Sequence, residues 1–377
     1  MNLARRTVEP VLEKYLLPGK VLILYGPRRV GKTTLINQLI EKNKHVSILL
    51  RAEEKVTQEA FSSLESYKMK NLVGENKFVF IDEAQKIKNI GENLKLFIDT
   101  FPEIAVLASG SSSFDLARKI GEPLTGRQNV IILYPFSQKE LINYWGRVRA
   151  LSSLEEILIY GSYPEVINFS LAEDKKNYLD ELIHSYLYKD ILEFDSVKNS
   201  GKIFDLLSLV AYQIGNEVSV TELSRQLEIS KNTVTRYLDL LEKAFVLIKV
   251  RGFSRNLRSE ITNNCRYYFW DNGVRNALIS NFNPLARRAD TGQLWENYLA
   301  VERTKKQSYD PLFANNFFWR TYGQQEIDWV EEREGKLFGY EFKWQKNKGK
   351  KPALWTNTYP NAEFEIINKD NYLDFVI

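Results

Sequence analysis

Short apolar runs alternate with helical segments through the first third of the chain. The strand-like runs, which are rich in β-forming side chains, cover residues 21–26, 45–52, 77–85, 104–113 and 128–136. The segment after the first run carries its apolar residues at helical spacing. Buried strands that alternate with helices are typical of a parallel sheet with helices on both faces. The pattern therefore predicts an α/β domain over residues 1–150.

The loop between the first strand and the helix that follows fits the phosphate-binding pattern G-x-x-x-x-G-K-[ST]. It comprises Gly26, Pro27, Arg28, Arg29, Val30, Gly31, Lys32 and Thr33, and Thr34 follows it. Glycines in such a loop let backbone N–H groups close around phosphates at a helix N-terminus, whose dipole also favours anions. We expect Lys32 to contact the phosphates and Thr33 to ligate Mg²⁺. The whole loop, with Thr34, is predicted to bind the nucleotide.

The apolar strand at 77–85 delivers two carboxylates, Asp82 and Glu83. The carboxyl ends of parallel strands form the ligand-binding edge of an α/β sheet. We expect Asp82 to hold Mg²⁺ and Glu83 to polarise the attacking water. The arrangement resembles the RecA/AAA branch of P-loop NTPases, in which the fourth strand ends in a polar residue that senses the γ-phosphate. The resemblance implies this role for Ser109 or Ser111, although either one can instead cap the next helix.

The chain turns strongly helical after this domain. The motif GSYPEVI (161–167) marks a turn, and residues 177–194 predict an amphipathic helix that covers the nucleotide or packs between domains. Residues 151–255 are therefore predicted to form a helical lid followed by a small binding module.

The module covers residues 218–253. Their pattern predicts a helix, a tight turn, a second helix to about Lys243 and a strand that is followed by basic residues. Ser219 and Glu222 form the pattern of a capping box at the first helix. This order of elements is typical of a winged helix-turn-helix. The exposed start of its second helix would carry Lys231, Asn232, Thr233, Thr235 and Arg236. Such modules bind DNA or other proteins, and the sequence leaves both open.

Residues 326–344 predict a β-hairpin that turns at Glu334 and Gly335. In that register Asp328 lies directly opposite Glu341, where like charges are destabilising. A positive charge should therefore sit between them. Lys343 points to the same face as Glu341 because strand side chains alternate, and a divalent metal would offset the repulsion further. The plain alternative is a surface salt bridge.

Length and charge refine this picture. A chain of 377 residues predicts two or three domains. The net charge of +4 does not by itself indicate a nucleic-acid binder. Basic clusters at 250–259 and 343–352 suit a phosphate backbone, although each can be an ordinary solvated face. A single cysteine and the lack of long apolar stretches predict a cytoplasmic protein without a membrane partner.

The chain resembles the bacterial and archaeal AAA-superfamily P-loop ATPases whose C-terminal half is a domain of unknown function. The resemblance covers nearly the whole chain and rests on GPRRVGKTTL, FIDEAQKI, ASGSSS, LTGRQNVIILYPFSQKEL and GSYPEVI. It implies a RecA/AAA-type domain that uses ATP and Mg²⁺. In the family's G-R step, Gly126 and Arg127 here, the arginine is implied to stabilise the transferred phosphoryl group in cis or in trans. Its alternative role is a surface ion pair.

The C-terminal carboxylates resemble a second family. Asp328, then Glu341 and Lys343 on the neighbouring strand, with Glu296 on a preceding helix, are similar to the PD-(D/E)xK core of restriction endonucleases. The resemblance implies that the carboxylates hold Mg²⁺ and that the lysine activates water to attack a phosphodiester. Ile327 stands where that motif has proline. A restriction-endonuclease-like α/β domain over residues 256–377, active or catalytically inert, is therefore expected.

The sequence thus predicts an ATPase that binds MgATP and uses Lys32, Glu83 and Arg127 in hydrolysis. The resemblance implies that its ATP cycle is coupled to a DNA-directed C-terminal half. The competing hypothesis is an ATP-dependent regulatory switch that recruits a protein partner or a second copy of the chain. A small-molecule kinase is disfavoured because Glu83 suits water activation. ATP is favoured over GTP because no N-K-x-D element lies in a suitable loop.

Overall fold

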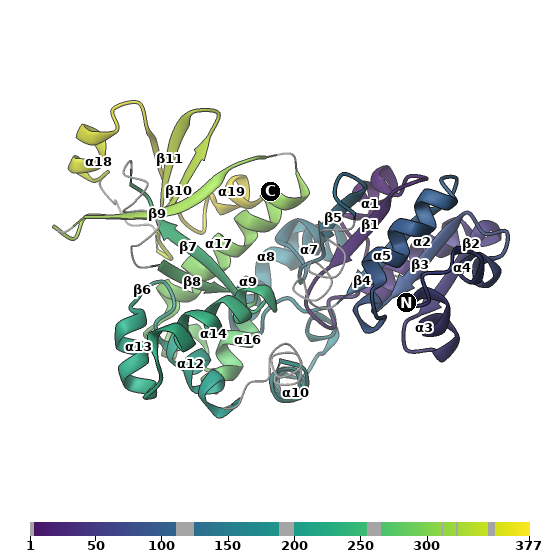
Figure 1. Ribbon diagram of the computed structural model, residues 1–377. Coiled ribbons are helices and arrows are strands. Elements are labelled where there is room, and N and C mark those ends of the chain that lie inside the picture. Colours follow the sequence, from purple (N-terminus) through teal and green to yellow (C-terminus); the bar gives the residue numbers. More distant parts are fainter. Residues whose placement is uncertain are drawn as a thin grey trace. The chain divides into compact units, whose positions relative to one another are not determined.

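The computed structural model describes residues 4–110, 124–187, 200–254, 265–310, 312–321, 323–345 and 351–377 (Figure 1). The chain divides into two compact units. One comprises residues 1–136 with 243–245, and the other comprises residues 137–242 with 246–377. Each unit is built around one β-sheet.

The first unit holds a five-stranded sheet in the order β2-β3-β4-β1-β5, and every pairing is parallel. Its strands are β1 (Val21–Tyr25), β2 (Ser47–Arg51), β3 (Phe78–Asp82), β4 (Ala105–Gly110) and β5 (Gln128–Ile132). The connecting helices are α1 (Glu9–Tyr15), α2 (Lys32–Lys42), α3 (Lys55–Phe61), α4 (Ser66–Val73) and α5 (Ile90–Thr100). The predicted α/β sheet is confirmed.

The strand that separates β1 from β3 in the sheet is β4, whereas β2, which lies between them in the chain, forms the edge. All side chains of β1 and β4 are buried, since both strands have neighbours on both sides. This explains why both read as continuous apolar runs. The carboxyl ends of β1, β3 and β4 therefore meet at one edge of the sheet.

The second unit begins with helices and turns. They are α7 (Gln138–Trp145), α8 (Arg147–Ser152), α9 (Leu154–Tyr160), η3 (Val166–Asn168), α10 (Ala172–Glu181), the π-helical segment η4 (Leu182–Leu187) and α12 (Ser200–Tyr212). The helices further along are α13 (Val220–Leu227), α14 (Lys231–Lys243), α16 (Asn272–Leu278), α17 (Thr291–Tyr309), α18 (Ala353–Thr358) and α19 (Tyr372–Val376). Part of the long helix expected over 177–194 lies outside the described residues.

The sheet of the second unit has seven strands in the order β12-β11-β10-β9-β7-β8-β6. They are β6 (Glu217–Val218), β7 (Leu247–Gly252), β8 (Cys265–Phe269), β9 (Asn315–Arg320), β10 (Glu326–Arg333), β11 (Lys336–Phe342) and β12 (Glu363–Ile367). β7 pairs with both β8 and β9. The domain boundary expected at residue 255 therefore falls within a single sheet.

The helix-turn-helix order appears where the sequence predicts it. The Ser219 side chain caps α13 by accepting the Glu222 N–H, and Ser230 accepts the N–H of Thr233 at the start of α14. Glu228 adopts a left-handed conformation with φ 55° at the end of α13, and α14 begins three residues later, at Lys231. The strand that follows is β7.

None of the helices in the described ranges combines the length and apolar character that crossing a bilayer requires.

Candidate functional site

The phosphate-binding loop leaves β1 and leads into α2. Gly26 at its start lies so close to the residue after β5 that a Cβ atom there would come within 2.1 Å of the Leu133 carbonyl oxygen. Only glycine fits this approach. The loop ends at Gly31, whose φ of 95° turns the chain into the first turn of α2.

The N-terminus of α2 is arranged to receive an anion. No side chain caps it, and its first turn contains no acidic residue. Its first N–H groups and dipole therefore favour a phosphate group. Lys32 is buried, and its ammonium group donates hydrogen bonds of 2.8 Å to the carbonyl oxygens of Gly26 and Pro27. The lysine is thus held against the loop that it is predicted to serve.

Asp82 joins the loop to the neighbouring strands. Its Oδ2 atom accepts a hydrogen bond of 2.7 Å from Thr33 Oγ1, and its Oδ1 atom accepts one from the hydroxyl of Ser109 on β4. Thr33 and Asp82 present the hydroxyl and carboxylate oxygens that Mg²⁺ prefers. The structure places the sequence-predicted metal residues together, and of the two serines it brings Ser109 to them. Ser111 lies outside the described residues.

Glu83 follows β3 in a left-handed conformation with φ 56°, which is uncommon for a residue other than glycine. Its carboxylate accepts a hydrogen bond of 2.5 Å from the Gln85 side chain. Strained backbone of this kind is often retained at functional sites. Because Glu83 directly follows Asp82 at the end of β3, it lies at the same edge of the sheet.

Thr34 lines an open cavity of about 450 Å³ between α1 and α2. The other lining residues are Arg5, Glu9, Asn37, Gln38, Glu41 and Lys42. The P-loop residues Arg28, Arg29 and Val30 connect β1 to α2, as predicted. Val30 is fully buried, and Arg29 has a φ of 62°.

Arg6 is a loop contact that sequence reasoning missed. Its guanidinium donates to the carbonyl oxygens of Val30, at 2.8 Å, and Tyr134, at 2.5 Å. The same group lies 4.4 Å from the ring centroid of Phe136. Arg6 therefore braces the P-loop against the segment after β5. The sequence around Arg6 contains no pattern that predicts its contacts with Val30 and Tyr134.

Arg127 does not reach this site in its own chain. It immediately precedes β5, and its carbonyl oxygen accepts the N–H of Val21, at the start of β1. The P-loop leaves the other end of β1, about 13 Å away at the usual rise per residue. The side chain instead forms an ion pair with Asp99 on α5. This placement corrects the expectation of a role in cis, whereas a role in trans stays a prediction.

The hairpin in the second unit forms in the predicted register. β10 and β11 pair from Arg333 with Lys336 to Trp329 with Tyr340, and the next positions in this register are Asp328 and Glu341. Glu334 and Gly335 have φ values of 50° and 74°, as a type I′ turn requires. The predicted hairpin is confirmed.

The carboxylates gather as expected, but around a different cation. Arg266 on β8 is buried, and its Nη1 atom lies 3.1 Å from Glu296 Oε1 and 3.4 Å from Asp328 Oδ1. Its Nη2 atom lies 2.9 Å from Glu326 Oε2. Lys343 pairs with Glu341 instead, at 2.6 Å. The positive charge beside Asp328 is therefore Arg266, and Asp328 is buried rather than part of a surface salt bridge.

Burial dominates the protonation of this cluster. It raises the pKa of Glu296 to about 8, and the nearby Asp328 carboxylate adds to the effect. Burial and Asp328 likewise raise the pKa of Glu341 to about 7, although the bond from Lys343 opposes them. Within the described ranges, no group of three or more His, Cys, Asp or Glu residues is arranged to hold a metal ion.

The basic segment after β11 lies largely outside the described residues, which exclude Lys346, Lys348 and Lys350. Lys351 is described, and its ammonium group donates to the Ala362 carbonyl oxygen at 3.0 Å.

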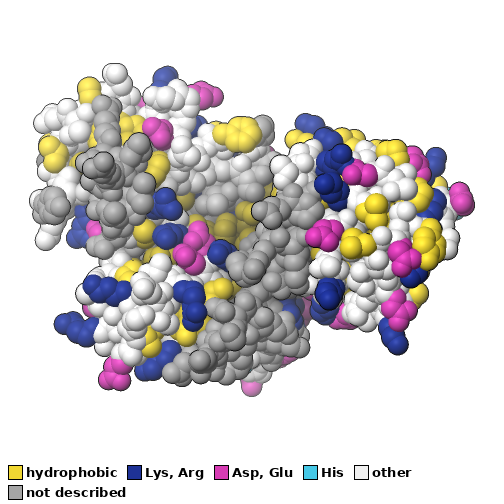
Figure 2. Space-filling model, viewed as in Figure 1, with side chains coloured by type: hydrophobic (Ala, Val, Ile, Leu, Met, Phe, Trp, Pro, Cys, Tyr) yellow, Lys and Arg dark blue, Asp and Glu magenta, His cyan; other side chains and the backbone are white. Residues whose placement is uncertain are grey.

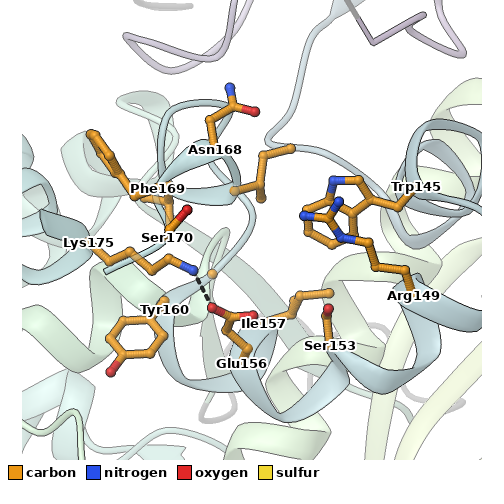
Figure 3. Close-up of a pocket in the computed structure, with 13 residues that line it drawn as sticks. Trp145, Arg149, Ser153, Glu156, Ile157, Tyr160, Asn168, Phe169, Ser170 and Lys175 are labelled. Carbon is orange, nitrogen blue, oxygen red and sulfur yellow. Dashed lines mark hydrogen bonds and ion pairs between the residues drawn. The ribbon is translucent and has the colours of Figure 1, made fainter. Parts of the chain in front are cut away.

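The motif GSYPEVI contains the predicted turn, at residues 164–165, and packs against Asp271. Asp271 accepts backbone N–H bonds from Ser162, at 2.7 Å, and from Gly273, at 2.9 Å. Gly161 lies directly against this carboxylate. The motif also lines a cavity of about 210 Å³, in which Figure 3 shows Lys175 pointing toward Glu156 and Arg149 stacked on Trp145.

Comparisons with known proteins agree with the P-loop geometry. Residues 18–142 match a family model described as AAA domain. Residues 151–285 and 291–357 match two models described as domains of unknown function, DUF8612 and DUF4143. The P-loop, Asp82 and Glu83 thus lie within the part of the chain that matches the AAA domain model.

Relatives extend along most of the chain. The chain is 26% identical over 346 residues to the uncharacterized protein Rv2008c of Mycobacterium tuberculosis, covering 91% of this chain and 74% of that protein. It is 25% identical over 344 residues to the uncharacterized protein MJ1544 of Methanocaldococcus jannaschii, covering 86% and 75%.

Solved structures with local similarity include AMPPCP-bound DnaA from Aquifex aeolicus and the Pif1 helicase from Candida albicans. DnaA is 15% identical with a TM-score of 0.30, covering 62% of this chain and 85% of DnaA. The helicase is 16% identical with a TM-score of 0.28, covering 48% of each chain. Scores of this size do not indicate a shared overall fold.

Proposed function

We propose that the chain binds MgATP at the P-loop and hydrolyses it. The observation that carries this proposal is the contact between Thr33 and Asp82, which places a hydroxyl and a carboxylate beside the uncapped N-terminus of α2. Bound Mg²⁺ would neutralise charge on the β- and γ-phosphates. Lys32 would release its two loop carbonyls to contact the same phosphates.

Glu83 is the proposed general base. As the water oxygen bonds to the γ-phosphorus and the bond to ADP breaks, Glu83 would take up the proton that the water loses. Its position beside Asp82 on the ligand-binding edge supports this role. Ser109 would sense the γ-phosphate indirectly, through the hydrogen bond that it gives to Asp82.

We further propose that the ATP cycle acts on a DNA-directed second unit in which α13, α14 and the following strands form a winged helix. Lys231, Asn232, Thr235 and Arg236 are exposed at the start of α14. Lys and Arg side chains also lie over the region of α12, α13 and α14 in Figure 2. An exposed, basic helix start following a tight turn suits the major groove and its phosphates.

A second candidate function is favoured by one observation in the carboxylate cluster. Because Arg266 bridges Glu296 and Asp328, the nuclease-like half would be catalytically inert. The ATP cycle would then control binding of a protein partner or of another copy of the chain.

Nucleotide binding is tested by titrating a fluorescent ATP analogue into wild type and Lys32→Ala. We expect the variant to lose binding, because the Lys32 ammonium group lies against the loop, bonded to the carbonyl oxygens of Gly26 and Pro27. The matched control is Lys55→Ala, since Lys55 has a side chain 90% exposed on α3. Equal affinity of Lys32→Ala and wild type would overturn the assignment.

The two functions of the second unit are separated by DNA incubation with Mg²⁺ or Mn²⁺, with and without ATP. Cleavage that Glu341→Ala abolishes would support a nuclease. Intact DNA in every nucleotide state would support the inert, regulatory alternative.

A further inference from the structure

The carboxylate cluster contains two fixed cations of its own. Glu296 comes from α17, Glu326 and Asp328 from β10, and Glu341 from β11. Arg266 and Lys343 lie among them. Arginine stays charged at any depth of burial, whereas buried carboxylates require a partner. The buried carboxylates therefore need Arg266 and Lys343 as charge partners.

Arg266 lies where two presumed metal ligands face each other. Its Nη1 atom approaches Oε1 of Glu296 and Oδ1 of Asp328 at 3.1 and 3.4 Å. A magnesium ion between the same two oxygens would need to contact each at about 2.0 to 2.1 Å. The guanidinium and the metal ion cannot both occupy that space.

Three of the four oxygens of Glu296 and Asp328 are already engaged. Asp328 Oδ2 accepts the backbone N–H of Phe342 at 2.8 Å. The Oε1 atom of Glu296 also accepts the hydroxyl of Tyr268 at 2.7 Å. With Arg266 in place, Glu296 and Asp328 therefore do not fit a divalent metal ion that bridges them.

Arg266 is also held from outside the cluster. Its guanidinium lies 4.8 Å from the ring centroid of Phe318, and its backbone pairs with Val250 on β7 and Glu217 on β6. A planar guanidinium fixed by stacking and by three carboxylates loses little freedom when it bridges them.

We propose that Arg266 is the resident cation of this cluster, taking the place of the divalent metal that a PD-(D/E)xK centre uses. The bridge fixes β8, the strand that pairs with β7, to α17 and β10. The ion pairs of the cluster then connect these elements without a metal ion. This inference does not depend on ATP hydrolysis, because all of its residues belong to the second unit.

The test measures Mn²⁺ binding by electron paramagnetic resonance in nucleotide-free protein. Asp82→Asn serves as the parent protein, since it weakens the predicted metal site at the P-loop. We expect the parent and its Asp328→Asn derivative to bind Mn²⁺ equally. A Mn²⁺ site in the parent that Asp328→Asn abolishes would overturn the proposal.

Replacement of Arg266 in the same parent provides the second comparison. Arg266→Met should lower the melting temperature of the second unit by roughly 10 °C and create a Mn²⁺ site that Asp328→Asn removes. Arg266→Lys, which keeps the charge, should remain closer to the parent and free of Mn²⁺. An Arg266→Met protein as stable as the parent and still without Mn²⁺ would contradict the proposal. If Arg266→Met fails to fold, the Asp328→Asn comparison decides.

Discussion

The hydroxyl of Thr33 lies 2.7 Å from the carboxylate of Asp82, so the first turn of α2 is hydrogen-bonded to the end of β3. These residues are 49 positions apart in the chain, and the parallel order of the sheet brings them to one edge. The contact joins the predicted phosphate-binding and metal-binding residues in one site.

Thr33→Val should therefore remove most of the Mg²⁺ dependence of ATP binding, because it keeps the side-chain shape and deletes the hydroxyl. We expect ATP affinity in Mg²⁺ to fall roughly tenfold, which is about 1.4 kcal/mol. Titration of a fluorescent ATP analogue with Mg²⁺ or with EDTA measures the difference. Thr33→Ser is the control, because it keeps the hydroxyl and should therefore keep the Mg²⁺ dependence. A Thr33→Val protein with the full Mg²⁺ effect would refute the metal-ligand role.

Gly161→Ala should strongly destabilise the second unit. A Cβ atom at this position would come within 1.9 Å of Asp271 Oδ1, and the residue has a φ of 76°. The backbone conformation alone costs roughly 1–3 kcal/mol for a side chain, and the steric clash adds to that cost. Urea unfolding measures the total.

Gly146→Ala is the matched control for Gly161→Ala, since Gly146 has a φ of 82° and no atom within 4 Å of its virtual Cβ. The difference between the two variants isolates the packing of the GSYPEVI motif on Asp271. Equal losses of stability would show that this packing contributes nothing.

Binding of DNA through α14 should depend on salt and on its two exposed basic residues. We expect Lys231→Ala and Arg236→Ala to weaken binding of all sequences alike and to reduce the slope of log K against log salt by about 0.9 for each lost phosphate contact. Fluorescence anisotropy with a labelled duplex at several salt concentrations measures both effects. An unchanged slope, as expected for the control Lys55→Ala, would favour the protein-interaction alternative.

The ion pairs of Asp290 should make the stability of the second unit sensitive to acid. Burial opposes ionisation, but the bonds from Arg288 and Arg275 outweigh it and lower the pKa of Asp290 to about 2. A carboxyl group whose pKa is lowered by folding stabilises the fold fully at pH values above its unfolded pKa, which is 3.8 here. This contribution is lost as the pH falls through the folded pKa of about 2.

Asp290→Asn should therefore cost about 2 kcal/mol at pH 5 and progressively less between pH 4 and pH 2. Unfolding by urea at several pH values measures the difference from wild type. Asp174→Asn, at an exposed position on α10, is the control. A loss of stability that did not change with pH would point to packing rather than to the ion pairs.

The first unit could be predicted from sequence because its signals are local. Gly26 and Gly31 lie within one loop, and Asp82 and Glu83 end one apolar strand. The order of parallel strands then brings these segments together. The hairpin at Glu334 and Gly335 was predictable for the same reason, since turn residues fix its register.

The contacts that sequence reasoning missed join segments far apart in the chain. Arg266 bonds to Asp328, 62 residues away, and Arg6 bonds to the carbonyl of Tyr134, 128 residues away. No periodicity connects such pairs. A signal for Arg266 did exist, because an arginine within the aromatic strand CRYYF must find a partner if it is buried. Arg127 immediately precedes β5, which runs parallel to β1, so it lies at the opposite end of the strands from the P-loop.

ATP hydrolysis by Glu83→Gln tests the central claim most directly. Glutamine keeps the size of the side chain but cannot accept the proton from water. The account predicts that Glu83→Gln binds ATP as wild type does and hydrolyses it at least roughly 100-fold more slowly in a steady-state phosphate-release assay. A Glu83→Gln protein that released phosphate as fast as wild type would contradict the account.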